Sequence, residues 1–155
     1  MHYIIEGIDP APYRALFGLD EAALARHGAI RVTCDDRAGF PCRITLEDAV
    51  PGETLLLLNH ASREGATPYR ASHAIFVREA AGAAASYRDS IPPVFASRRL
   101  SLRGFDAKGM MVDAMITEPG GAEAGLETLF ANPGIVEIDV HNAARGCFAA
   151  RARRA

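Results

Sequence analysis

The densest set of side chains that could do chemistry lies between two apolar segments, Thr54–Asn59 and Ala74–Arg78, which are both typical of strands. The polar residues in or beside this connection are His60, Ser62, Arg63, Thr67, Tyr69, Arg70, Ser72 and His73. A connection of about a dozen residues in a compact domain is commonly a binding loop. Arginine offers a planar, bidentate donor fork that suits carboxylates and phosphates.

We therefore expect the loop to bind an anionic small molecule. The expected ligand-binding residues are Arg63, Tyr69, Arg70, Ser72 and His73. The alternative is that the arginines here are solvated, or paired with Glu64 and Glu79.

A second candidate lies in the last expected hairpin. If Val136–His141 pairs with Cys147–Ala152 around a five-residue loop, His141 and Cys147 face each other. Opposed residues have Cβ atoms about 4.5–5.5 Å apart, which allows a thiol–imidazole contact. A neighbouring imidazole favours the reactive thiolate and can carry its proton. This pattern supports an alternative hypothesis, an enzyme with Cys147 as nucleophile and His141 as base. The competing interpretation makes Cys147 a small core residue.

Two carboxylates and an imidazole, from Glu137, Asp139 and His141, share one face of the first of these strands. Such a set could bind a metal ion or perform acid–base chemistry, but the solvated face of an antiparallel sheet has the same pattern, which we favour. The histidines and cysteines lack the closely spaced ligand pairs of zinc sites. The sequence indicates no metal and no cofactor.

Composition narrows the classes of partner. The 155-residue chain has a net charge of −2, which gives no electrostatic case for binding nucleic acid. No apolar segment approaches the roughly 20 residues needed to cross a bilayer, and the first residues do not resemble a secretory leader. Three cysteines are an odd, sparse set rather than a disulfide framework. We expect a bacterial, cytoplasmic protein without a membrane partner.

The elements that would position these residues are mostly strands joined by short turns. Strands are expected at Tyr3–Glu6, Ala29–Cys34, Cys42–Leu46, Thr54–Asn59, Ala74–Arg78, Arg99–Phe105, Met110–Thr117, Val136–His141 and Cys147–Ala152. Helices are expected from Asp9 to about Phe17, at Glu21–Arg26 and at Gly121–Phe130. The second and third strands would form a hairpin around Asp35–Pro41.

This order predicts an α+β domain over residues 1–155, with a mainly antiparallel sheet of hairpins and two or three short helices. An exposed strand edge would leave a further possibility, a protein-interaction module that forms a homodimer.

Several short segments also carry a resemblance. They are Pro41–Arg43, Pro51–Glu53, Pro68–Glu79, Leu100–Arg103, His141–Asn142 and Gly146–Phe148. Together they resemble the bacterial family labelled domain of unknown function 1203, over nearly the whole chain. The resemblance implies no activity, cofactor or catalytic residue.

Overall fold

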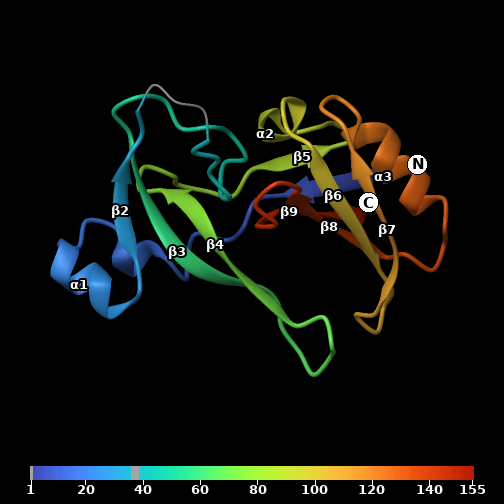
Figure 1. Cartoon of the computed structure of the whole chain (residues 1–155), viewed down its shortest axis with the longest axis horizontal. Helices are drawn as coiled ribbons and strands as arrows, with labels where there is room; N and C mark the ends of the chain where they lie inside the picture. Colours follow the sequence, from blue (N-terminus) through green and yellow to red (C-terminus); the bar gives the residue numbers. More distant parts are fainter. Residues whose placement is uncertain (1, 36–38) are drawn as a thin grey trace.

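Two antiparallel sheets form the framework of the protein, seen in a computed structural model that describes residues 2–35 and 39–155 (Figure 1). The larger sheet has the order β5 (Ser86–Arg88), β1 (Tyr3–Glu6), β9 (Phe148–Arg154), β8 (Glu137–Asn142), β6 (Leu100–Phe105) and β7 (Met111–Thr117). The smaller sheet has the order β2 (Ile30–Thr33), β3 (Thr54–Arg63) and β4 (Ala71–Arg78). The helices are α1 (Glu21–Arg26), α2 (Pro93–Ala96) and α3 (Ala122–Phe130), with a 3₁₀ turn, η1, at Arg14–Leu16. The α+β class and the single domain are as predicted.

Helix α3 covers one face of the larger sheet. Its apolar residues Leu126, Leu129 and Phe130 are buried in one cluster with Leu102 of β6. At Gly125 a Cβ atom would come within 2.6 Å of Leu102 Cδ1, so glycine lets the helix approach the sheet closely. The expected helix over Gly121–Phe130 is therefore confirmed, with Gly121 as its N-cap.

The smaller sheet has a separate core. Leu24 of α1 packs in one buried cluster with Leu56, Val77 and Ile44. Helix α1 begins as expected, because the Asp20 side chain accepts a hydrogen bond of 2.7 Å from the backbone N–H of Ala23. Each sheet thus has its own apolar support, and β4 of the smaller sheet contacts β9 of the larger one.

The expected hairpin of Ala29–Cys34 with Cys42–Leu46 is wrong. Strand β2 pairs with β3 instead, and Cys42–Leu46 is a turn region. Its contacts with β4 include a bridge between Cys42 and Phe76 and a hydrogen bond of 3.3 Å from the backbone N–H of Arg78 to Cys42 Sγ. The backbone N–H of Leu46 donates to the carbonyl of Cys42, and Leu46 has a φ of 55°, which cannot continue a strand. The tip of the expected hairpin includes residues 36–38, which lie outside the described residues.

The first expected helix is shorter than predicted. From Asp9 to Phe17 the chain forms turns and η1. Pro12 disfavours the α conformation for the preceding residue, Ala11, within what would be the first helical turn. Strand β5 and helix α2 were not predicted. Their residues lie in an Ala-rich and Pro-rich region without apolar alternation.

The long polar loop is also shorter than predicted, because most of it is strand. Strand β3 continues to Arg63 and β4 begins at Ala71, with His60 opposite His73 and a bulge between Ala61 and Arg63. The resulting arm reaches from the smaller sheet towards the β6–β7 hairpin (Figure 1). Arg63 of the arm donates to Asp139 of β8, so the arm contacts the larger sheet, an arrangement that local sequence does not reveal. Within the described ranges, no helix has the length and apolarity needed to cross a membrane.

Candidate functional site

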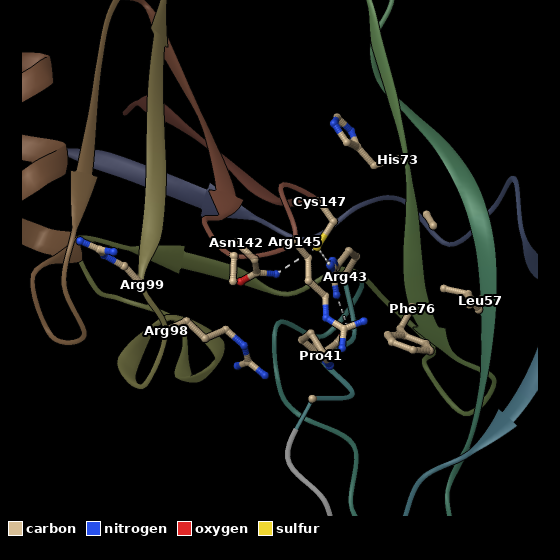
Figure 2. A pocket seen from close by; sticks show the side chains of 13 residues that line it. Pro41, Arg43, Leu57, His73, Phe76, Arg98, Arg99, Asn142, Arg145 and Cys147 are labelled. Atoms are coloured by element: carbon tan, nitrogen blue, oxygen red, sulfur yellow. Dashed lines mark hydrogen bonds between the residues drawn. The ribbon is translucent and has the colours of Figure 1, made fainter.

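A pocket of about 480 Å³ opens between the smaller sheet and the turn that joins β8 to β9 (Figure 2). Its basic and polar lining residues are Arg43, Arg98, Arg99, Arg145, His73, Asn142 and Cys147, and its apolar ones include Pro41, Leu57, Ala74 and Phe76. The described part of the lining contains no Asp or Glu. A concave surface with one sign of charge concentrates ions of the opposite sign. The pocket is therefore suited to an anion.

Arg43 is the buried arginine among the residues that line this pocket. Its side chain is 3% exposed, with Nε donating to the carbonyl of Phe148 at 2.8 Å and Nη1 to that of Pro41 at 2.6 Å. Nη2 donates to Cys147 Sγ at 3.1 Å. Burial lowers the pKa of Arg43, since desolvation disfavours its charge, and the Cys147 sulfur opposes that shift. Among the described residues no carboxylate neutralises this guanidinium, so a buried positive charge faces the sulfur.

Cys147 directly precedes β9, and its sulfur receives a second hydrogen bond. Asn142 Nδ2 donates to Cys147 Sγ at 3.4 Å. Dashed lines in Figure 2 mark the hydrogen bonds that Cys147 Sγ accepts from Asn142 and Arg43. A guanidinium and an amide directed at a sulfur stabilise negative charge on it. Cys147 is partly exposed, whereas Cys34 and Cys42 are buried. This cysteine is therefore the thiol that a small molecule in the pocket can reach.

The expected pairing of His141 with Cys147 is wrong by one residue. A register shift between Val140 and His141 places His141 opposite Phe148, and Asn142 bonds to the carbonyl of Cys147 through its backbone N–H at 3.0 Å. Such a bulge adds a residue to one strand and moves every later side chain to a new partner. The described contacts of the Cys147 sulfur come from Arg43 and Asn142 rather than from the imidazole.

His141 is a buried imidazole, 2% exposed. Nδ1 donates to the carbonyl of Gly146 at 3.0 Å, and the ring packs edge-on against His73 at a centroid distance of 5.0 Å. Burial lowers the pKa of His141 from 6.5 to about 4. With the proton on Nδ1, Nε2 carries the lone pair at neutral pH. The imidazole could accept a proton, but no described contact links it to the thiol.

The strand face shared by Glu137, Asp139 and His141, expected to be solvated, is largely buried, with Asp139 and His141 each only 2% exposed. The β3–β4 arm covers this face. Arg63 Nε donates to Asp139 Oδ2 at 2.9 Å and Nη1 lies 2.8 Å from Glu137 Oε1, while Arg151 Nε donates to Asp139 Oδ1 at 2.6 Å. Arg63 is thus held in an ion-pair network and not presented to a ligand.

The other expected ligand-binding residues separate into two places. Tyr69 packs edge-on against Phe105 at 5.7 Å, and Arg70 and Ser72 are exposed on the β3–β4 arm. His73 lines the pocket beside Cys147. The structure therefore brings His73 and Cys147 to one site and leaves the others on the arm.

Sequence reasoning missed the pocket arginines Arg43, Arg98 and Arg145. The available signal for Arg43 was a charged residue within the apolar segment Cys42–Leu46, which is unusual for a buried position. Arg98 and Arg145 had no such signal, since each stands in a polar connecting segment.

A second pocket of about 510 Å³ lies near the start of the chain. Its charged lining residues are Glu6, Asp9, Glu64, Arg151 and Arg153. Because both signs of charge are present, this pocket gives no clear preference for one ion. Over the described residues no group of three His, Cys, Asp or Glu side chains is placed to hold a metal ion.

Comparison with known proteins gives one match. No curated protein and no solved structure matches the chain. The match is to a family model described as "Protein of unknown function (DUF1203)", over residues 39–154. The described residues that line the arginine-containing pocket all lie within this range. The chain therefore belongs to the DUF1203 family, as its short segments suggested.

Proposed function

We propose that the protein binds a small organic anion in the pocket lined by Arg43, Arg98, Arg145 and Cys147. The observation that carries this proposal is the gathering of arginines in a 480 Å³ pocket whose described lining has no carboxylate. Pockets of this volume are typical of small-molecule sites. The apolar lining from Leu57 and the ring of Phe76 favours a ligand with a carbon skeleton beside its charge.

The arginines differ in what they can offer a ligand. Arg145 is exposed and has no hydrogen-bond or ion-pair partner among the described residues, so its donor fork is available. Arg98 points towards the centre of the view in Figure 2 but is held by Asp48 through hydrogen bonds of 3.0 and 2.6 Å. Arg99 points away from the centre and pairs with Glu118. Arg145 is therefore the principal ligand contact, and Arg43 adds charge beneath it.

A thermal-shift comparison of benzoate with benzylamine tests this proposal, because the two probes share a ring and differ in the sign of their charge. Benzoate is expected to raise the melting temperature of the wild-type protein and benzylamine is not. Arg145→Gln should lose the effect. Arg26→Gln removes an exposed arginine of α1, outside the pocket, and should keep it. Equal shifts with both probes, or an unchanged benzoate shift in Arg145→Gln, would refute anion binding here.

The alternative, an enzyme with Cys147 as nucleophile and His141 as its base, has weaker support. The position of Cys147 in the pocket favours the first half of the hypothesis. The described hydrogen bond of the His141 ring joins Nδ1 to the carbonyl of Gly146 and not to the thiol. A homodimer, and a location in the bacterial cytoplasm, remain predictions from sequence.

A further inference from the structure

We infer that Cys147 is a reactive thiol that forms mixed disulfides with small anionic disulfides inside this pocket. The inference rests on the proposed function, because the same arginines would select the negative charge of the reactant. It adds the chemical class of the ligand and a covalent step to simple binding.

The first argument is the environment of the sulfur. Two donors are directed at Cys147 Sγ, one of them from a guanidinium that is 3% exposed and has no carboxylate partner among the described residues. The thiolate is the form that attacks a disulfide, and a neighbouring arginine favours it. The alternative partners of Arg43 are the carbonyl oxygens of Pro41 and Phe148, which are neutral. A thiolate on Cys147 would be the missing counter-charge.

The second argument is access. Cys147 is partly exposed and lines the pocket, whereas Cys34 and Cys42 are 4% and 0% exposed and are not among its lining residues. A disulfide that enters the pocket therefore meets one thiol only. The two buried cysteines serve as internal controls in the same chain.

The third argument is the charge and shape of the surroundings. With a carboxylate of a small disulfide against Arg145, near the buried charge of Arg43, its carbon groups would lie along Leu57 and Phe76. A cationic disulfide would meet arginines without a described carboxylate in the lining. The pocket thus discriminates by charge before the covalent step.

The reaction balances without a further oxidant. The Cys147 thiolate attacks one sulfur of the small disulfide, and a new S–S bond forms as the old one breaks. The electron pair of the broken bond leaves with the second sulfur as a small thiolate, which takes a proton from water according to its own acidity. Cys147 is oxidised to a mixed disulfide, and the released half of the reagent is reduced to a thiol.

The test compares three disulfide probes on the full chain at pH 7. They are 5,5′-dithiobis(2-nitrobenzoate), which is a dianion, 2,2′-dithiodipyridine, which is neutral, and cystamine, which is a dication. Each second-order rate constant is divided by that of N-acetylcysteine amide with the same probe, so that differences between leaving groups cancel. Peptide mass spectrometry identifies the modified cysteine. We expect Cys147 to react first, with a corrected preference for the dianion over the dication of about tenfold or more.

Variants separate selection of the anion from activation of the thiol. Arg145 has no described bond to the sulfur, so Arg145→Gln should reduce the charge preference several-fold and leave the rate with the neutral probe nearly unchanged. Arg43→Lys should slow reaction with all three probes, and Cys147→Ser should abolish the fast reaction. Arg26→Gln, remote from the pocket, should behave as wild type. If Arg43→Lys does not fold, the Arg145 comparison still decides.

Two results would overturn the inference. One is a ratio of corrected rate constants, dianion to dication, that equals one, which would mean that Cys147 discriminates no more than the free thiol. The other is labelling of Cys34 or Cys42 at the same rate as Cys147. The proposed function can fail separately. Benzoate stabilisation of Cys147→Ser without charge-selective exchange in the wild type would retain anion binding and reject the covalent step. Fast, charge-selective exchange without benzoate binding would retain the covalent step and reject stable, non-covalent binding of a carboxylate.

Discussion

The guanidinium Nη2 of Arg43 lies 3.1 Å from the sulfur of Cys147, although 104 positions of the chain separate the two residues. Arg43 stands in the turn region beside the smaller sheet, whereas Cys147 directly precedes β9 of the larger sheet. This contact therefore closes the site only when both sheets are in place.

Replacing Arg43 should destabilise the protein more than replacing its sulfur partner. Arg43→Leu leaves the carbonyls of Pro41 and Phe148 without their described side-chain donors. Loss of buried hydrogen-bond partners predicts a decrease of about 2–4 kcal/mol in the free energy of unfolding, measured by urea denaturation. Cys147→Ser keeps those two bonds and should cost about 1 kcal/mol or less. Similar losses in the two variants would contradict this role of Arg43.

Stability should rise with pH between about 4 and 6.5 because of His141. Its pKa is about 4 in the folded protein against an ordinary value of 6.5 in the unfolded chain, so between these limits the unfolded chain binds more protons. The free energy of unfolding should therefore increase with pH in this window, by up to about 1.4 kcal/mol per unit, and level off above it. Burial also lowers the pKa of His73 and His60, which adds slope of the same sign.

The matched control for this pH dependence is His141→Asn. An asparagine amide can replace the donor to the Gly146 carbonyl but does not titrate. Urea denaturation at several pH values should give a shallower slope for the variant than for the wild type. Two parallel curves would show that His141 does not cause the effect.

The ion-pair network under the β3–β4 arm should be costly to break. Asp139 accepts hydrogen bonds from Arg63 at 2.9 Å and from Arg151 at 2.6 Å. Asp139→Asn leaves two guanidinium groups with one fewer carboxylate, and the expected loss is about 3–5 kcal/mol of unfolding free energy.

The control for the network is the exposed pair of Arg99 and Glu118, whose side chains are 63% and 70% exposed. Glu118→Gln should change stability by less than about 1 kcal/mol, because solvent screens surface ion pairs. Chemical denaturation of both variants measures the difference. Equal effects at Asp139 and Glu118 would mean that the network contributes no more than a surface pair.

The fold was predictable wherever the pattern was local. The hairpin of β6 and β7 follows from alternation and a turn at Asp106–Gly109, and α3 follows from apolar residues at helical spacing. The extension of β3 and β4 through polar residues was not predictable in this way. The polar residue Arg63 at the end of β3 is bound by Asp139 of the other sheet, which is distant in sequence.

The site was predictable only in part for the same reason. His73 and Cys147 were singled out by residue type, and both line the pocket. Arg43, which gives the pocket its buried charge, is brought there by tertiary contacts alone. The error of one residue at His141 came from a bulge, which period-two alternation does not encode.

An NMR titration with benzoate at pH 7 tests the central claim, anion binding between the sheets, most directly. The account predicts saturable shifts of backbone amide resonances concentrated at residues 142–147 and 73–76, and their loss in Arg145→Gln. Shifts concentrated around Glu64 and Arg153 in the second pocket, or no saturable shift at all, would contradict it.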